Sequence, residues 1–462
     1  MMEIDLEIQP SDLAGPLQNM WPISARKITT LCTSYDSDRG SPVFTVHGRY
    51  TSKGWTEWTQ GFQYGWAVLQ FDATGDATCL ELGRKETLDR MAFHVSHIGV
   101  HDHGFNNVST YGHLRRLMLE RRMPFDEWEL NFYEMALKAS AAVQAARWSR
   151  TFDGSGYIHS FNGPHSLFAD TMRSLRSLSL GHHLGHCLMG ENDERIDLLD
   201  RMIQHARTTA EYNVFYGQGR DVYDVPGRVA HESVFNPTDG RFRTSATQQG
   251  YSPFTTWTRG LAWVMTGFAE QLEYIETVPD SDLERSGGRQ AVEDFMLRAA
   301  IATCDYYIQT SPTDGIPYWD TGAPGLAMLA DHTQRPADPH NPFEPVDSSA
   351  AAIGAQGLLR LGSYLERRGL DGRRYRAAGL GILARLLQPE YLSDDPNHQG
   401  LLLHGVYHRP RGWDHCPDPD GVPRGESVMW GDYHLIELST LVQRVIDGSR
   451  WFSFFSPADG DR

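Results

Sequence analysis

Six segments of the chain repeat one pattern, in which a polar cluster is followed by a helical stretch rich in Gly, Ala and Ser and flanked by aromatic residues. More charged, amphipathic stretches lie between them, with charges spaced for an exposed helical face. Small residues allow an inner helix to approach neighbours on both sides, which offsets the ~1 kcal/mol that a glycine costs in a helix interior. The repeat therefore predicts an all-α (α/α)6 barrel, a six-hairpin toroid of alternating inner and outer helices. The expected inner segments are residues 58–71, 101–114, 165–185, 256–272, 347–365 and 430–442, and outer segments include 125–148, 193–213 and 287–307.

This arrangement has a consequence for function, because all inner helices of alternating hairpins point the same way. Their six polar clusters should converge on one mouth of the barrel, fed by two long loops rich in Gly and Pro, residues 217–250 and 322–346. One or two strands are expected within residues 45–58. We expect a single catalytic domain over residues 1–462, with residues 1–20 as a flexible or packing arm.

Composition and charge exclude several classes of partner. Lys and Arg number 42 against 59 Asp and Glu, a formal net charge of −17 that repels nucleic acid. An anionic sugar could still bind where a pocket supplies a local cation. We expect no membrane partner, since no apolar run approaches the roughly 18 residues of a spanning helix. The acidic start and five scattered cysteines predict a cytoplasmic protein with reduced thiols. The oligomeric state is left open.

Two carboxylates begin inner helices inside otherwise apolar or small-residue stretches, Asp102 in HDHGF and Asp170 in HSLFADTMRSL. Burial raises a carboxyl pKa, and a second carboxylate nearby raises one of the pair further. One protonated acid and one base near neutral pH would suit glycoside cleavage. A helix N-cap or a buried hydrogen bond at a helix end is the structural alternative for either residue.

A second constellation lies between His231 and Trp263. It contains Gln249 in ATQQGYS, and Arg259 four residues before Trp263 on one helical face. An Arg can clamp a carboxylate, and a Trp can stack on a sugar ring. The structural alternatives are a salt bridge to a neighbouring helix for Arg259 and core packing for Trp263.

Other patterns give no cofactor or metal site. His182 and His186 in GHHLGHC have the spacing of a helical metal pair, but no HExxH and no carboxylate accompany them, which favours a structural role. The chain has neither a GxGxxG nor a Walker loop, so we predict no nucleotide, cofactor or metal.

In order and spacing, these strings resemble the unsaturated glucuronyl hydrolases of glycoside hydrolase family 88 from about Trp58 to Leu438. WTQGF resembles the family's WTxGF, HDHGF its HDxGF, and FADTM its IDxxM aspartate region. The later motifs that match are QQGYSPFTTWTRGLAW, DGIPYWDTGAP, VDSSAAAIGAQGLLRL and WGDYHLIELSTL.

The resemblance implies hydration of the C4=C5 vinyl ether of an unsaturated uronic acid at the non-reducing end of an oligosaccharide. Protonation of C4 and addition of water at C5 give a hemiketal that opens and expels the aglycone. Asp170 would be the general acid and base, while Asp102 would orient the double bond and hold up the pKa of its neighbour. The residues implied in substrate binding are His231 and Gln249 for hydroxyls or water, Arg259 for the anionic ring, and Trp58 or Trp263 for stacking.

Departures from the family pattern bear on the substrate. The Gln usual in RGQAW is Leu261, Arg173 and Ser174 follow the second aspartate in place of an Asn-rich stretch, WTxGF carries Gln60, and Phe161 stands where an upstream Trp is expected. The loop with His404, Tyr407, Arg409 and Arg411 would either contact the leaving sugar or be a solvated basic loop.

Three alternative functions remain open at this point. An unsaturated rhamnogalacturonyl hydrolase or another uronide hydrolase would use the same barrel. A sugar isomerase or epimerase would leave the mass of its substrate unchanged. In a non-catalytic sugar-binding barrel, both aspartates would be caps.

Overall fold

The small-residue segments form the inner ring of helices. The computed structural model describes residues 1–53 and 57–455, and in these residues each of the six expected inner segments is helical. Consecutive inner helices contact each other, and the last packs against the first, which closes the ring. The inner helices are α2 (Gln60–Thr74), α5 (His103–Asn107) continuing through the π-helical η4 (Val108–Gly112) into α6 (His113–Leu119), α8 (Thr171–Ser174) with α9 (Arg176–His183), α11 (Thr258–Ile275), α14 (Ser348–Arg367) and α16 (Met429–Ile446).

The charged stretches between them form the outer ring. In α10 the buried residues, among them Leu199, Met202 and Ile203, recur at helical spacing on one face. By contrast, α11 is buried along its whole length. The outer helices are α1 (Ala14–Ser34), α3 (Ala77–Arg90), α7 (Glu127–Ala146), α10 (Leu198–Tyr212), α13 (Arg289–Thr310) and α15 (Arg373–Leu386). The short helices α4 (Ala92–Val95) and α12 (Asp280–Leu283) lie in connections. Within residues 1–53 and 57–455, no helix is both long and apolar enough to cross a bilayer.

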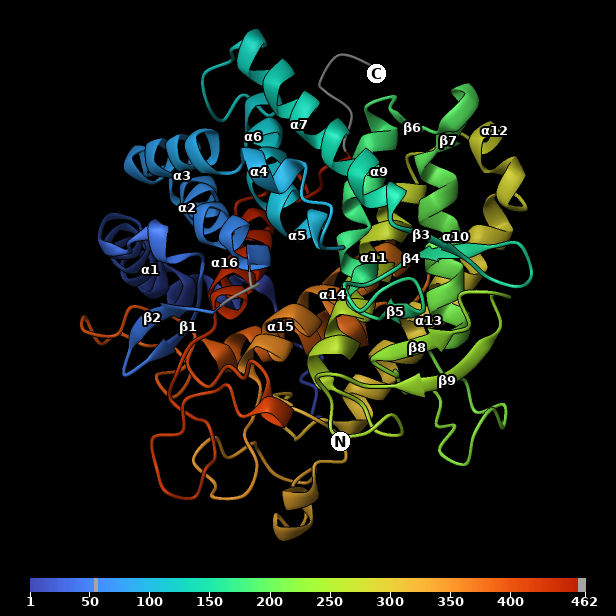
Figure 1. Ribbon diagram of the computed structural model, residues 1–462. Helices are drawn as coiled ribbons and strands as arrows, with labels where there is room; N and C mark the ends of the chain where they lie inside the picture. The colour runs from blue at the N-terminus through green and yellow to red at the C-terminus, as the bar shows by residue number, and fades with distance from the viewer. Residues whose placement is uncertain (54–56, 456–462) are drawn as a thin grey trace.

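Contact between the two ends of the chain completes the toroid. In Figure 1, α1 and α2 (blue) lie beside α16 (red), and α16 contacts both. Near the N-terminus the side chain of Met2 is buried, and its N–H donates to Ile308 O at 2.9 Å. The (α/α)6 architecture predicted from the repeat is confirmed.

Short strands occupy the loops. The β1–β2 hairpin (Pro42–Val46 and Arg49–Ser52) begins before the expected range of 45–58, of which residues 54–56 lie outside the described chain. A three-stranded antiparallel sheet of β5 (Ser166–Phe168), β8 (Glu232–Phe235) and β9 (Phe242–Ala246) leads into α8. Two smaller hairpins pair β3 (Trp148–Arg150) with β4 (Gly156–Ile158), and β6 (Cys187–Met189) with β7 (Arg195–Asp197).

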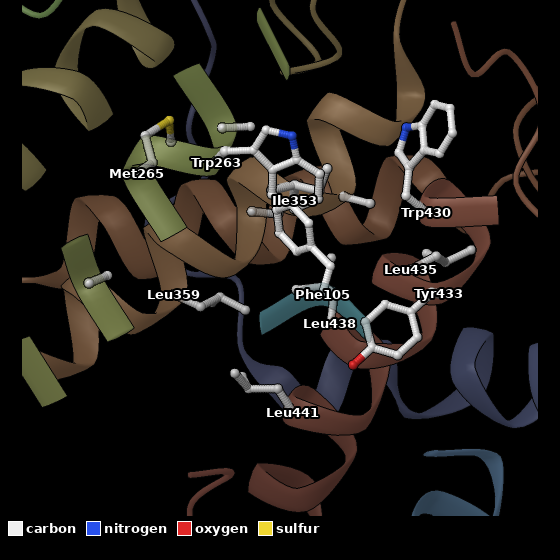
Figure 2. Close-up of a cluster of buried hydrophobic side chains, with 14 of the residues drawn as sticks. Phe105, Trp263, Met265, Ile353, Leu359, Trp430, Tyr433, Leu435, Leu438 and Leu441 are labelled. Carbon is white, nitrogen blue, oxygen red and sulfur yellow. The ribbon is translucent and has the colours of Figure 1, made fainter. Parts of the chain in front are cut away.

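Glycines allow the inner helices to touch through their backbones. A Cβ atom on Gly104 of α5 would lie 2.2 Å from Ser174 O of α8, and one on Gly61 would lie 2.3 Å from Asn106 O. Neither position has space for a methyl group, so these glycines are required by close approach. Side chains fill the space where the helices diverge, as Figure 2 shows for Phe105 beneath Trp263.

A buried ion network ties the inner ring together. Glu437 of α16 accepts from Arg173 at 3.0 Å and from Arg176 at 3.2 Å, and Arg173 also pairs with Glu270 of α11. Gln356 of α14 donates to Glu437 at 2.9 Å. Burial alone would raise the pKa of Glu437, but Arg173 and Arg176 hold it well below its usual range. The network therefore connects helices from four of the six hairpins through buried charged side chains.

We expect Gly104→Ala to destabilise the fold, because the new methyl group would force α5 and α8 apart. Overpacking of this kind costs about 1–3 kcal/mol. Urea unfolding measures the change in free energy. Gly381→Ala in α15 is the matched control, since its Cβ would meet only Met2 Cε at 3.9 Å, and alanine there should be neutral or stabilising. Equal effects of the two substitutions would contradict this account of the glycines.

We also expect Glu437→Gln to cost about 3–5 kcal/mol at pH 7, because it leaves the buried Arg176 without its carboxylate partner and Arg173 with Glu270 alone. Glu276→Gln, which breaks the partly exposed pair with Arg367, should cost no more than ~1 kcal/mol. Because the pKa of Glu437 is lowered in the fold, its contribution is present above its ordinary value and is lost as the pH falls. The difference between Glu437→Gln and wild type should therefore shrink in acid, and a constant difference would contradict the network's role.

Candidate active site

A cavity of about 740 Å³ opens at the N-terminal ends of the inner helices, where the polar clusters were expected to converge. Six of the seven site residues predicted from the sequence line it, and they come from four inner helices or the residues just before them: Trp58, Asp102, Asp170, Gln249, Arg259 and Trp263. The seventh, His231, lies behind the wall. The remaining lining residues are Phe93, His97, Gly99, Val100, His101, Phe105, Phe161, Gln248, Trp257, Tyr407, His408 and Trp413.

The two aspartates occupy equivalent places on neighbouring inner helices. Asp102 directly precedes α5 and Asp170 directly precedes α8, yet neither makes a side-chain hydrogen bond that caps its helix. They are 7% and 8% exposed, and both border the cavity. Capping therefore does not explain them, and both carboxyl groups are available to a ligand.

His101 lies between the two carboxyl groups. Its Nε2 is 3.3 Å from Oδ1 of Asp170 and 3.7 Å from Oδ1 of Asp102. Burial raises the pKa of Asp102, and the charge of Asp170 adds to this against the opposing effect of His101. Burial would also raise the pKa of Asp170, but its hydrogen bond and attraction to His101 lower it overall. The pKa values of the two carboxyl groups thus move in opposite directions, and Asp102 is the harder of the two to ionise.

This order reverses part of the sequence-based expectation. Asp102 was expected to hold up the pKa of Asp170, whereas the structure lowers the pKa of Asp170 because the imidazole of His101 lies closer to it than to Asp102. The sequence analysis did not single out His101. Its place beside Asp102 in HDHGF is the one signal that could have done so, because residue types do not show where its ring points.

His231 supports the cavity from behind. The β5–β8 pairing brings it next to Asp170, since Ala169 N donates to His231 O at 2.8 Å. Nδ1 of His231 accepts from Gln248 N at 3.0 Å, and burial lowers its pKa, so the ring is neutral with its proton on Nε2. Within the described residues, that Nε2–H has no hydrogen-bond partner.

Arg259 joins three segments around the cavity. Its guanidinium donates to Asp347 Oδ2 at 2.9 Å, to Gln249 Oε1 at 3.0 Å and to Tyr407 O at 2.7 Å, with a further bond to Val406 O. The salt bridge to a neighbouring helix, which was the structural alternative, is therefore present. The same contacts orient Gln249, whose amide NH₂ is left to donate.

Aromatic rings form the apolar walls. Trp58 stacks on Trp430 at 4.8 Å between ring centroids, and Trp263 packs on Phe105 at 4.8 Å (Figure 2). Trp263 is 2% exposed, so it is both core and cavity wall. Trp413 faces the same space from the loop before α16. Flat apolar surfaces of this kind suit the face of a sugar ring.

One expectation about the surrounding loops needs correction, and the structure divides the residues of another loop for which two roles were left open. Gln248 and Gln249 of the 217–250 loop line the cavity, but no residue between 322 and 346 is among the described lining residues. That loop is held elsewhere, since Glu344 accepts from Trp319 Nε1 at 2.8 Å and from Gly325 N at 2.9 Å. In the loop before α16, Tyr407 and His408 line the cavity, whereas His404, Arg409 and Arg411 do not.

The His182 and His186 pair does not form a helical site. Helix α9 ends at His183, so the two residues do not share a helical face. Nδ1 of His182 instead bonds the hydroxyl of Tyr274 at 2.6 Å.

The chain is similar in sequence to known proteins over most of its length. No family model matches the chain. It is 26% identical to an unsaturated glucuronyl hydrolase of Bacillus sp. (strain GL1) over 417 residues, which cover 89% of this chain and 93% of that protein. It is 24% identical to an unsaturated chondroitin disaccharide hydrolase of Streptococcus pyogenes serotype M1, over 85% of this chain and 83% of the relative.

Solved structures agree on the fold. An unsaturated glucuronyl hydrolase specific for heparin superposes with a TM-score of 0.72 at 19% identity, over 94% of this chain and 98% of the other. The enzyme of Bacillus sp. GL1 superposes with a TM-score of 0.68 at 22% identity, over 96% and 99%. Fold and sequence together place the chain among proteins with the (α/α)6-barrel fold. It is similar to unsaturated glucuronyl hydrolases over most of its length, in agreement with the resemblance seen in its motifs.

The pKa split predicts opposite effects of two isosteric substitutions on stability. Asp102 has a raised pKa, so its ionisation disfavours the fold as pH rises above its ordinary value of 3.8, and Asp102→Asn should gain thermal stability relative to wild type between pH 4 and pH 7. Asp170 has a lowered pKa, so its contribution is present above its ordinary value of 3.8, and Asp170→Asn should be destabilising relative to wild type at both pH 4 and pH 7.

Melting temperatures of the two variants and wild type at both pH values check this prediction. Wild type at each pH is the control for the general effect of acid. Changes of the same sign in both variants would show that the carboxyl groups are not split as described.

Proposed function

We propose that this chain is a glycoside hydrolase that removes a 4,5-unsaturated uronic acid from the non-reducing end of oligosaccharides by hydrating the C4=C5 vinyl ether. The observation that carries the proposal is the pair of buried carboxyl groups, Asp102 and Asp170, which border one cavity and differ in acidity. Relatives named for this activity align over more than four fifths of the chain.

Asp170 is the proposed general acid and base. It protonates C4, and then takes a proton from the water that adds at C5, so that the hemiketal opens and the aglycone leaves. In the ligand-free site Asp170 is held ionised by His101. A bound uronate adds negative charge and expels water, and both effects raise the pKa of a neighbouring carboxyl group. Substrate binding thus prepares Asp170 to carry the proton.

The other residues take supporting roles. Asp102, the group harder to ionise, orients the double bond through its carboxyl group. The Nε2–H of His231 and the amide of Gln249 bind hydroxyl groups or the attacking water. Trp58 and Trp263 offer ring faces for stacking. Arg259 contributes its charge and holds Gln249 in place, because its own hydrogen bonds go to the protein.

We propose that four further lining residues contact the leaving sugar. Tyr407, His408 and Trp413 come from the loop before α16, and Phe161 comes from the 159–165 turn. Their aromatic rings and the imidazole of His408 are offered to the aglycone. Phe161 departs from the family pattern, as Leu261 and Arg173 do, and these departures bear on the identity of the aglycone.

We also propose that the protein acts in the cytoplasm. Its five cysteines are all unpaired in the structure, and Cys79 and Cys304 are buried. Reduced, packed thiols are typical of that compartment.

The test follows the loss of the ultraviolet absorbance of the conjugated uronate on a panel of lyase-generated disaccharides. Unsaturated chondroitin and hyaluronan disaccharides are compared with unsaturated rhamnogalacturonan disaccharide. Asp170→Asn should lower the rate by about 10²–10⁴-fold, the usual contribution of a general acid or base. Asp239→Asn, an exposed carboxylate in the β8–β9 turn, is the control and should keep the wild-type rate.

The pattern of activity decides between the alternatives. Loss of absorbance with gain of one water identifies hydration, and the preferred disaccharide identifies the aglycone. Wild type that leaves every disaccharide unchanged would overturn the proposal and favour saturated uronides. A product of unchanged mass would favour an isomerase.

A further inference from the structure

In the chemistry proposed above His101 only keeps Asp170 ionised, yet its ring lies between the two carboxyl groups of the site. It is 1% exposed, borders the cavity, and places one ring nitrogen within 4 Å of both carboxyl groups. A buried imidazole in contact with two carboxylates requires a physical reason.

The ring of His101 is fixed in its position. Its backbone oxygen accepts from Ser174 Oγ at 2.8 Å and from Gln144 Nε2 at 2.9 Å, so the residue is anchored to α7 and α8. Phe161 stacks on the ring at 6.0 Å, and Phe168 meets it edge-on at 5.6 Å. These contacts direct Nε2 toward the aspartates and leave little freedom to turn away.

The other ring nitrogen, Nδ1, has no acceptor comparable to the carboxylates beside Nε2. Nδ1 of His101 is buried and, among the described residues, has no hydrogen-bond partner. Protonation of both nitrogens would therefore be unfavourable without a compensating charge. Asp102 and Asp170 supply that charge on the Nε2 side, and in an apolar enclosure their attraction is strong.

The surrounding ionisable groups distinguish His101 from its neighbours. Burial lowers the pKa values of four nearby histidines, to about 4 for His103 and His159, to about 3 for His205, and also for His231, so these rings are neutral at pH 7. Arg147 opposes a charge on His101, but its guanidinium is engaged by the carbonyls of His159 and Ser160. Burial also lowers the pKa of His101, yet the two aspartates raise it overall.

We propose that His101 is a positioning residue that holds the proton of this site, bridging Asp170 and Asp102 as an imidazolium in the ligand-free protein. It keeps Asp170 ionised and close to Asp102 until an anionic ligand enters. The proton then passes from Nε2 to Oδ1 of Asp170, which leaves a neutral ring beside a carboxylic acid. This inference rests on the proposed function, because Asp170 is the group through which His101 acts.

The first experiment measures the pH dependence of kcat/KM for wild type and His101→Gln on the preferred unsaturated disaccharide. Glutamine keeps a donor at this position but cannot hold a proton, so the site should lose its proton at lower pH. We expect the basic limb of the profile to move toward acid by about one pH unit or more. His159→Gln, a neighbouring histidine outside the cavity lining, should leave the limb in place. A uniform loss of rate with an unchanged basic limb would overturn the proposal.

A second measurement does not depend on activity. Nitrogen-15 NMR of histidine-labelled wild type, with the His101 signals assigned by their loss in His101→Gln, reports whether both ring nitrogens are protonated. We expect an imidazolium for His101 at pH 7 that becomes neutral in Asp170→Asn. A neutral ring in wild type at pH 7 would overturn the proposal, whatever the activity of His101→Gln. Inactive wild type with an imidazolium at His101 would instead reject only the proposed substrate.

Discussion

The rest of the structure depends on the ion network around Glu437, because its buried ion pairs hold the inner ring closed. Arg173 of α8 and Arg176 of α9 bind Glu437, and Gln356 of α14 donates a hydrogen bond to it. His434, one turn earlier on α16, lies 3.7 Å from Glu437 and packs edge-on against Trp263 at 4.9 Å. The cavity wall at Trp263 is therefore connected to the network through His434.

The near-complete burial of the two carboxyl groups gives them their properties. Asp102 and Asp170 border the cavity but are almost entirely covered by protein, so nearby charges act through little solvent. A single imidazole at 3.3 Å from one and 3.7 Å from the other is then enough to separate their acidities. The same two residues on an open surface would titrate alike.

The net charge of −17 makes the local charges of the cavity important for an anionic ligand. Among the described lining residues, Arg259 is the one arginine or lysine, and its hydrogen bonds go to Gln249, Asp347 and the 406–407 backbone. In the proposed function its field would favour a uronate, while Gln249 would make the contact. Arg259 would then act on the ligand through its charge and through Gln249, because its own hydrogen bonds go to the protein.

The sequence by itself determined the barrel and most of the site, because both rest on local signals. The glycine-rich repeat encodes helix contacts such as Gly104 with Ser174, and motif order placed Asp102, Asp170, Gln249 and Arg259 at helix starts that must meet at one mouth. Only the tertiary structure decided which carboxyl group is the weaker acid, that Arg259 bonds to protein, and that the 322–346 loop lies away from the cavity. The physical reason is that acidity and hydrogen-bond pairing depend on distances of a few ångströms between segments far apart in the chain. Residue types and spacing do not contain those distances.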